Sequence, residues 1–425
     1  MLLVIKKMAG IILLRRLVIA LIFGLSVNLP AVADINDQIE SALRFGQPDS
    51  TNWGQMKLSV NYRYEFADID DTTPEPANAN TFRLLLGYLS PQMNGFQGFF
   101  EYENIFATQN NYRVGAVYGD ANHHVVTDPA DRHELNQLWI SYQGVPGTVI
   151  KGGRQRIKID DDRFIGNVGW RQMEQTYDAV MVTNRSISDM TIKAGYIGRV
   201  RNIFSLTDNV DAPFINVNYQ LDSVGHVIGY GYWLDYRDDS KNKEKSSQTY
   251  GVRLLGSPQV NQNLTLHYTA EYSYQQDYGS NPVDYSVDRY NMMAGATLFG
   301  LTFKGAIEQQ EGKDGSSFRT PLGTNHAFQG WADRFLTTPE TGLRDVSATL
   351  ATKIKGAKLM FVYHNFQDDV GRVDFGDEYN VLVTKKIGKH YKLLAKYAYY
   401  DGDANATGTF KNDTQKIWFQ ANVSF

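Results

Sequence analysis

The sequence has no cysteine, only 8 histidines in 425 residues, and no excess of basic over acidic residues, at 42 against 46. Without thiols there is no disulfide framework, no thiolate nucleophile and no cysteine-ligated zinc or iron–sulfur site. The balance of charge excludes a nucleic-acid binder built on net positive charge. We expect no cofactor, no bound metal and no nucleic-acid partner.

Long apolar runs are confined to the N-terminus, and nothing after residue 33 approaches the ~20 apolar residues of a spanning helix. Basic residues at 6, 7, 15 and 16 precede an apolar run over 17–27, and Ala31-Val32-Ala33 offers small residues at a cleavage site. We predict that 1–33 is a cleaved signal peptide. The alternative, a membrane anchor, is disfavoured by Pro30 and by the polar turn at Asp34.

What remains is a series of alternating segments. In 57–66, Leu58, Val60, Tyr62, Tyr64 and Phe66 share one face, and polar residues occupy the other. This two-residue period is typical of a strand. Helical periodicity is confined to one short amphipathic turn or two at 35–45. Such segments give about eighteen strands, centred near 61, 85, 101, 139, 152, 180, 194, 217, 230, 252, 269, 293, 305, 349, 362, 382, 396 and 419.

The connections between these strands alternate strictly between short and long. The short ones are 90–95, 144–147, 184–188, 221–223, 257–263, 299–300, 355–357 and 388–389, and the long ones are 68–80, 109–133, 159–174, 202–212, 235–247, 275–288, 311–344, 367–376 and 401–413. A bacterial outer-membrane barrel has this regularity, with periplasmic turns at one rim and extracellular loops at the other. Both outermost connections are long, so the number of strands is even.

We therefore predict an all-β fold: a single transmembrane antiparallel β-barrel over 55–425 in the cell outer membrane, after a short periplasmic segment at 34–54. In lipid every backbone polar group must be paired, and a closed barrel is the β structure that achieves this. Half of each strand then faces water, which explains a mean hydropathy of -0.38. The 26 tyrosines suit the aromatic girdles at the membrane surfaces.

The last predicted strand ends in an aromatic residue. Ile417, Phe419, Ala421, Val423 and Phe425 share one face. This pattern resembles the signal that the barrel-assembly machinery recognises. We expect that machinery to bind the protein through Phe425, and outer-membrane lipid to surround the folded barrel.

A barrel of about eighteen strands is too wide for its own side chains to fill, so it conducts or is plugged. Only about twenty residues precede the first strand, too few for a plug domain, so we expect a pore. The candidate pore-lining residues are Arg63, Arg83, Glu101, Glu103, Lys151, Arg154, Arg156, Arg171, Lys193, Arg199, Arg253, Lys304 and Arg334. Their basic excess favours anionic solutes. The alternative for any one of them is pairing with a neighbouring carboxylate.

Two long connections have particular compositions. Asp160, Asp161 and Asp162 follow the basic stretch 151–158, and Arg donors there suit a sugar-acid polymer. The three aspartates could instead hold Ca²⁺, although consecutive residues lack the usual alternate spacing of a calcium loop. The 311–345 connection is too aromatic for a solvated loop. It is either a gate or lid over the permeation path or a loop packed for rigidity.

Several segments together resemble the alginate-export family of outer-membrane barrels: 61–65 (NYRYE), 153–155 (GRQ), 169–172 (GWRQ), 321–336 (PLGTNHAFQGWADRFL) and 338–345 (TPETGLRD). The resemblance spans nearly the whole mature chain. It implies an eighteen-stranded porin-type channel with an arginine- and lysine-lined constriction that passes an anionic polysaccharide. Arg154 and Arg171 match its motifs and are the pore candidates that it supports.

Two other classes of barrel compete with a passive channel. A barrel lipase or protease needs a nucleophile activated by a base. The histidines are scattered, however, and none falls in a compact grouping with a serine and an acid, so we expect no enzymatic activity. A structural or adhesive outer-membrane barrel would conduct no ions.

Overall fold

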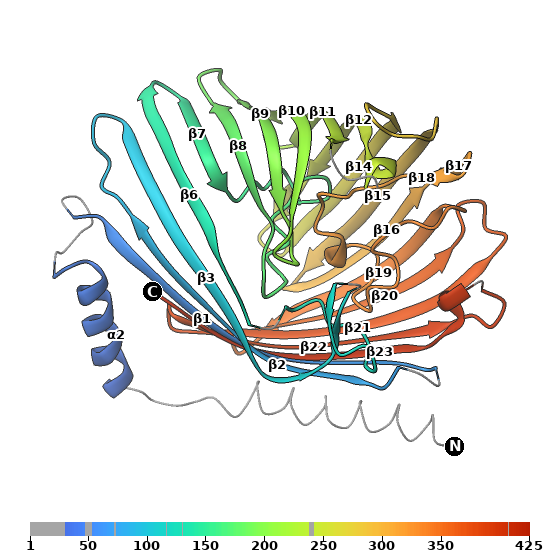
Figure 1. Ribbon diagram of the computed structural model, residues 1–425. Coiled ribbons are helices and arrows are strands. Elements are labelled where there is room, and N and C mark those ends of the chain that lie inside the picture. Colours follow the sequence, from blue (N-terminus) through green and yellow to red (C-terminus); the bar gives the residue numbers. More distant parts are fainter. Residues whose placement is uncertain are drawn as a thin grey trace.

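Eighteen long strands form one closed antiparallel barrel in the computed structural model (Figure 1). The structure describes residues 30–46, 53–71, 74–115, 117–129, 131–237, 242–406 and 408–425. Each strand pairs with the next along the chain, and the first pairs with the last, from Ser59 opposite Ser424 to Ile69 opposite Thr414. The predicted barrel and strand number are confirmed. Residues 1–29 of the predicted signal lie outside the described residues.

The bounds of the barrel strands follow the predicted centres. They are β1 (Gln55–Ile69), β2 (Ala77–Leu89), β3 (Phe96–Asn111), β6 (Arg132–Val145), β7 (Thr148–Gln155), β8 (Thr176–Asn184), β9 (Met190–Arg201), β10 (Thr207–Leu221), β11 (Gly225–Tyr236), β12 (Ser247–Gly256), β14 (Leu264–Asp277), β15 (Ser286–Leu298), β16 (Leu301–Gln310), β19 (Leu343–Ile354), β20 (Ala357–Gln367), β21 (Asp374–Ile387), β22 (Tyr391–Gly402) and β23 (Thr414–Ser424). Smaller strands lie in the connections: β4 (Arg113–Val114), β5 (Tyr118–Gly119), β13 (Gln259–Asn261), β17 (Gly312–Lys313) and β18 (Ser316–Ser317).

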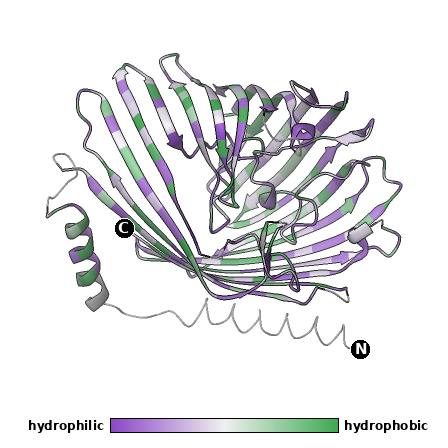
Figure 2. Ribbon diagram, viewed as in Figure 1, coloured by the Kyte–Doolittle hydropathy of each residue, from purple (hydrophilic) through white to green (hydrophobic). Residues whose placement is uncertain are grey.

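Alternation divides each strand between an outer apolar face and an inner polar face. In β1, Asn61, Arg63 and Glu65 are buried inside the barrel, whereas Tyr62 and Tyr64 point outward. Apolar and polar residues accordingly alternate along the ribbons in Figure 2. Outward aromatic rings pack across strands, as where the ring of Phe82 lies 5.0 Å from that of Phe106. Such cross-strand pairs fix the register of the wall.

The connections explain the topology. Phe299 and Gly300 both have positive φ, 48° and 81°, and so do Lys355 and Gly356, 48° and 77°. Two such residues form the primed turn whose twist matches that of a hairpin, so each pair joins its strands tightly. One predicted long connection is shorter than expected. It covers only 202–206, because β10 begins at Thr207 and bulges near Asn209 instead of starting after it.

A helix lies beside the short-turn end of the barrel. It is α2 (Pro30–Leu43), longer than the helical turns predicted at 35–45, and it starts at Pro30, which suits a first helical turn. Glu40 pairs with Lys389 at 2.7 Å and with His390 at 3.1 Å, in the turn between β21 and β22. The ring of His390 stacks on that of Phe425 at 4.4 Å, so both ends of the described chain meet at this rim. Among the described residues, no helix is long and apolar enough to cross a bilayer.

Candidate pore constriction

Two long connections fold into the barrel and pack against each other. One runs over 156–175 between β7 and β8, and the other over 318–338 between β16 and β19; we call them together the lumen layer. Backbone bonds join them, from Gly166 N to Leu322 O at 2.9 Å and from Thr324 N to Asp162 O at 2.8 Å. Figure 1 shows both inside the ring of strands. The aromatic residues of 318–338 are therefore core residues of this layer: Phe318, Trp331 and Phe335 are buried.

A single carboxylate, that of Asp333, ties the lumen layer together and to the wall. It accepts from Arg171 Nη2 at 2.9 Å, from Lys416 Nζ of β23 at 2.8 Å and from His326 Nδ1 at 2.5 Å. Burial alone would raise the pKa of Asp333, but the charges of Arg171 and Lys416 and the hydrogen bond from His326 hold it well below its usual range. Burial and the nearby Lys396 and Arg171 lower the pKa of His326 well below 6.5 despite Asp333.

Next to this ion cluster, an ammonium group lies among three indole rings. Lys396 Nζ of β22 is 4.1 Å from the ring centre of Trp170, 4.0 Å from that of Trp331 and 5.4 Å from that of Trp418. Trp170 also stacks on His326 at 4.8 Å. Ring faces attract cations, and this attraction is strongest where water is excluded. Trp170 and Trp331 come one from each connection, so Lys396 fixes both halves of the layer.

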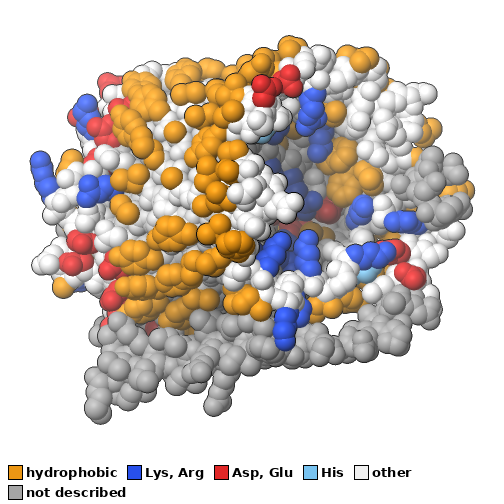
Figure 3. Space-filling view, turned by 180° about the vertical axis from the view of Figure 1, so that it is seen from behind, with side chains coloured by type: hydrophobic (Ala, Val, Ile, Leu, Met, Phe, Trp, Pro, Cys, Tyr) orange, Lys and Arg blue, Asp and Glu red, His pale blue; other side chains and the backbone are white. Residues whose placement is uncertain are grey.

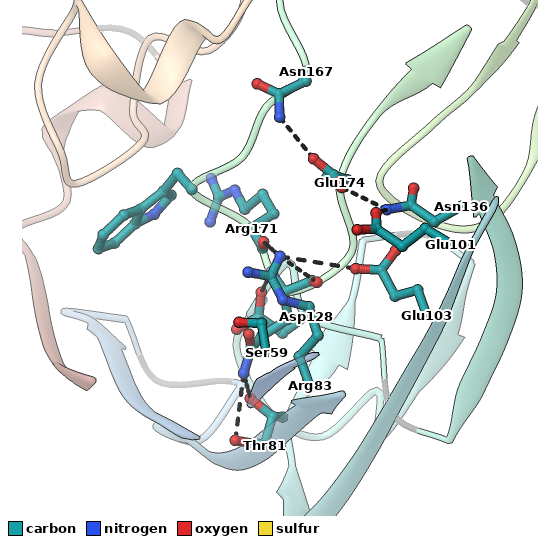
Figure 4. A network of polar contacts seen from close by, with 12 residues as sticks. Ser59, Thr81, Arg83, Glu101, Glu103, Asp128, Asn136, Asn167, Arg171 and Glu174 are labelled. Atoms are coloured by element: carbon teal, nitrogen blue, oxygen red, sulfur yellow. Dashed lines mark hydrogen bonds and ion pairs between the residues drawn. The ribbon is translucent and has the colours of Figure 1, made fainter. Parts of the chain in front are cut away.

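Arginines of β1 and β2 anchor the other side of the layer, and Figure 4 shows Arg83 of β2. Arg63 Nη1 lies 3.0 Å from each oxygen of Asp128, which belongs to the connection between β3 and β6. Arg83 Nη1 donates to the carbonyl oxygen of Gln172 at 3.2 Å and lies 3.8 Å from Glu103. Alanines 67, 77 and 79 of this wall are fully buried under Tyr112, Val114 and Val126, because their small side chains leave room for that connection.

Carboxylates of the wall hold the 156–175 segment by a shared network. Arg156 pairs with Glu101 at 2.6 Å and with Glu174, and Asn136 donates to the same two carboxylates at 2.9 and 2.5 Å. Asn167 donates to Glu174 at 2.7 Å, as Figure 4 shows. Glu101, Asn136 and Glu174 are all buried. Removing any one member would leave buried polar atoms unpaired.

On the opposite wall, acidic and basic groups alternate in a chain of contacts. The contacts run from Asp161 to Arg253 (2.9 Å), Arg253 to Glu271 (2.9 Å), Glu271 to Arg289 (2.9 Å), Arg289 to Glu308 (2.8 Å) and Glu308 to Arg163 (2.9 Å). The chain starts and ends in the lumen layer and crosses β12, β14, β15 and β16 between. Both walls therefore bind the lumen layer through ion pairs.

The layer separates two cavities. One, of about 740 Å³, lies on the long-loop side and is lined among others by Arg163, Arg171, Arg319 and His326. The other, of about 640 Å³, lies on the short-turn side and is lined among others by Arg253, Glu308, Phe328 and Trp331. Segment 325–331, which contains the one-turn helix η2 (Asn325–Ala327), contributes to both linings and stands between them.

The short-turn end of the barrel has a different charge pattern. Taking the five residues of each strand nearest its short turn, there is no aspartate or glutamate in any of the eighteen strands, but there are nine lysines. Eight of them lie on inward-facing positions of the registers: Lys57, Lys151, Lys193, Lys304, Lys353, Lys358, Lys386 and Lys392. Seen from behind, the molecule is hollowed, and Lys and Arg side chains gather at the hollow beside an apolar outer wall (Figure 3).

Two pairs of these lysines oppose each other directly. Lys353 stands across from Lys358 on β19 and β20, and Lys386 across from Lys392 on β21 and β22. Like charges at directly opposed positions destabilise a sheet. Among the described residues, none of these four lysines is within 4.0 Å of a carboxylate oxygen. The wall therefore keeps an unneutralised positive surface at some cost in stability.

The structure gathers most of the predicted pore residues in or around this region. Arg63, Arg83, Glu101, Glu103, Lys151, Lys193, Arg253 and Lys304 are on inward-facing positions, and Arg156, Arg171 and Arg334 belong to the lumen layer or border it. Lys151 lies 4.2 Å from the ring centre of the inward Trp139. Many of the arginines are paired with carboxylates, which is the alternative that the sequence left open.

Arg154 and Arg199 are corrections, because both lie on the outer face. Arg154 stands directly opposite Leu138, which is 52% exposed on the outside, and opposite Asp178. Lys151 faces inward three residues earlier, and an odd separation on a regular strand places Arg154 on the other side. Arg199 pairs with Asp178 because a bulge near Gly198 shifts the register of β9 by one residue. Such a bulge reverses the faces of all residues beyond it.

Sequence reasoning missed several groups of the constriction. Asp128 and Arg289 hold the layer but did not stand out, because a carboxylate in a long loop or a single arginine in a strand carries no local signal. Asp160, Asp161 and Asp162 do not converge: Asp160 accepts from Asn216 at 2.7 Å, Asp161 pairs with Arg253, and Asp162 binds Lys158. This arrangement does not resemble a calcium loop.

Comparisons with known proteins agree with this architecture. A family model described as alginate export matches residues 52–310. Among solved structures, the chain is similar to OccAB2 of Acinetobacter baumannii, with 17% identity, a TM-score of 0.68, and coverage of 87% of this chain and 98% of that one. It is similar to a BenF-like porin from Pseudomonas fluorescens Pf-5, with 14% identity, a TM-score of 0.68, and coverage of 89% and 100%. It is also similar to OccK9 (OpdG) of Pseudomonas aeruginosa, with 15% identity, a TM-score of 0.66, and coverage of 87% and 98%. No curated protein sequence matches the chain.

Proposed function

Because this chain belongs to the alginate export family, whose members are outer-membrane barrels, we propose that it is a porin-type channel selective for hydrophilic anions. The barrel lies in the outer membrane, with its apolar outer face in lipid, and forms a channel there. The proposal concerns the solute, the residues that select it and the absence of catalysis.

The observation that carries the proposal is the lysine-lined short-turn end of the lumen, where the five residues of each strand nearest its short turn include no acid. Opposed pairs such as Lys353 with Lys358 are unfavourable by themselves and become favourable when an anion lies between them. Fixed charges in a narrow, poorly screened space raise the local concentration of the oppositely charged solute. An anion would then pass from this lysine surface to the arginines of the wall and the lumen layer, such as Arg253 of β12 and Arg171.

In the conformation described, the lumen layer leaves room for a small solute. Cavities of about 640 and 740 Å³ on its two sides each have room for one or a few sugar-sized units. A polysaccharide chain would require segment 325–331 to move. We propose that the layer acts as the gate of the channel, and that carboxylated sugars are the class of solute it admits.

We further propose that the protein is not an enzyme. The described serine–histidine contact nearest to a catalytic pair is Ser257 Oγ to His267 Nδ1, at 3.0 Å. The other ring nitrogen of His267 contacts Thr297 Oγ1 at 2.8 Å, so no carboxylate orients the imidazole. A triad needs that third group.

We also propose that the barrel-assembly machinery recognises the protein through Phe425 and that the signal peptide is cleaved after residue 33. Membrane fractionation of Phe425 variants would test the first point, and N-terminal sequencing of the mature protein would test the second.

The test of the solute class is uptake into proteoliposomes. Galacturonate and galactose have nearly the same size and differ by one carboxylate, so the proposed channel admits galacturonate several times faster. Trimers of the two sugars show whether the lumen layer excludes chains. Equal rates for the acid and the neutral sugar would contradict the proposal.

A further inference from the structure

A strip of charged residues on the outside of the barrel contains Arg154 and Arg199, the two arginines that were predicted on the wrong face. The strip crosses β7 to β11 at their long-loop ends and contains Arg154, Asp178, Arg199, Asp211, Asp235 and Arg237. Arg237 follows directly after β11 and pairs with Asp211, and it donates to the hydroxyl of Tyr196 at 2.6 Å. Three arginines and three aspartates leave the strip with no net charge, so its binding properties depend on how each arginine is paired.

Arg199 is the arginine of the strip whose charge is least neutralised. Arg154 already binds both oxygens of Asp178, through Nε at 2.7 Å and Nη2 at 3.0 Å. Arg199 Nη1 is 3.9 Å from the same carboxylate, beyond hydrogen-bond distance, and its side chain is 61% exposed. The guanidinium of Arg199 therefore presents donors away from the protein, on a face that borders lipid.

The strip lies at the upper edge of the apolar outer band. Leu138 is directly opposite Arg154, and Val180 follows Asp178 on the same face; they are 52% and 54% exposed. An arginine at this edge is at the level of lipid headgroups, where charged side chains are tolerated if a partner meets them. On the outside of this barrel such a partner is a lipid.

On β15, β21 and the loop before β23, the corresponding rim carries aspartates. Outward tyrosines donate to aspartates of the neighbouring strand there: Tyr272 to Asp288 at 2.8 Å, Tyr363 to Asp377 at 2.7 Å and Tyr399 to Asp413 at 2.5 Å. Anionic headgroups meet repulsion at those positions. The arginine strip is a distinct sector of the rim, so an anionic lipid is expected to bind there in preference to the rest of the rim.

We propose that the arginine strip binds the phosphate of a phosphorylated lipid headgroup in the outer leaflet. The planar guanidinium group matches phosphate in a two-point contact, and Arg199 is placed to make it. Arg237 supplies a second cation along the strip, and the exposed Val180 and Leu138 contact the acyl chains. The inference does not depend on which solute the channel passes.

Native mass spectrometry of the detergent-purified full-length protein tests the proposal, with diphosphoryl lipid A as the probe and its dephosphorylated form for comparison. We expect the phosphorylated lipid to bind in preference, and Arg199→Gln to weaken its binding about tenfold, the effect of one charged hydrogen bond. Arg344→Gln is the matched control, because Arg344 is on the outer face at the long-loop end of β19 and bonds to Gln367. It is expected to leave binding unchanged.

Three outcomes would overturn the proposal. They are equal binding of the two lipids, unchanged binding by Arg199→Gln, and an equal loss with Arg344→Gln. Circular dichroism and heat-modifiable gel mobility show whether each variant is a folded barrel. If Arg199→Gln fails to fold, Arg237→Gln, outside the strands, replaces it with the same expected direction.

Discussion

At the scale of single residues, Asp333 is the group on which the lumen layer most depends. Asp333→Asn removes the charge that Arg171 and Lys416 share and leaves two buried cations without their partner. Breaking a buried pair in this way costs about 3–5 kcal/mol. We expect the layer to loosen, with larger and noisier single-channel currents in planar bilayers. Asp288→Asn, which changes the same charge on the outer rim, is expected to keep wild-type currents; similar noise in both variants would contradict this role.

His326 gives the layer a dependence on pH. Its pKa is lowered well below 6.5 by burial, so the imidazole is neutral in the packed layer and regains its ordinary pKa when the layer detaches. The detached state then binds more protons, and the packed state loses stability as pH falls below about 6.5. We expect current noise to rise from pH 7.5 to pH 5 in the wild type and much less in His326→Gln. The same pH dependence in both proteins would assign it to another group.

Met292 and Met293 of β15 are adjacent residues on opposite faces of the wall. Met292 is 57% exposed on the outer face, whereas Met293 lines the cavity on the short-turn side. A lysine in place of an outward residue near mid-strand costs about 2–4 kcal/mol in a bilayer. We expect Met292→Lys to lower the unfolding free energy by that amount and Met293→Lys to lower it by much less. Urea unfolding in lipid vesicles measures both, and equal losses would mean that the faces are assigned wrongly.

At the scale of elements, the strands were predictable and the inward connections were not. Along β1, apolar residues that face lipid alternate with polar residues that face the water-filled lumen. This two-residue period is visible in a single sequence. The bulge near Gly198 has no such signal, so Arg199 was predicted on the wrong face. The aromatic content of 318–338 indicated that it packs somewhere. Its partners Lys396 and Lys416 lie far along the chain and could not be paired with it.

Replacing 318–338 by a short Gly-Ser linker tests the role of that connection. Segment 325–331 separates the two cavities, so its removal joins them. We expect single-channel conductance to rise severalfold while the protein remains a folded barrel, because each barrel strand keeps both of its neighbours. Unchanged conductance would show that the permeation path runs elsewhere in the lumen.

At the scale of the whole molecule, charge is arranged along the axis of the barrel. The lumen layer and the walls that hold it contain paired acids and bases, while the short-turn ends of the strands, the five residues of each nearest its short turn, contain lysines and no acids. The sequence predicted a basic excess but not this division, because strand position along the axis becomes clear only when all registers are known. The division makes the short-turn mouth the place where anions are first selected or last released.

The reversal potential under a salt gradient, measured on single channels in planar bilayers, tests the anion selectivity most directly. We expect an anion-selective wild type, a clear shift toward cations in Lys386→Glu, and no shift in Lys385→Glu. The reason is that Lys386 opposes Lys392 on the inner face, while Lys385 opposes the outward Leu393. The two variants change the net charge equally. A cation-selective wild type, or equal shifts in both variants, would contradict this expectation.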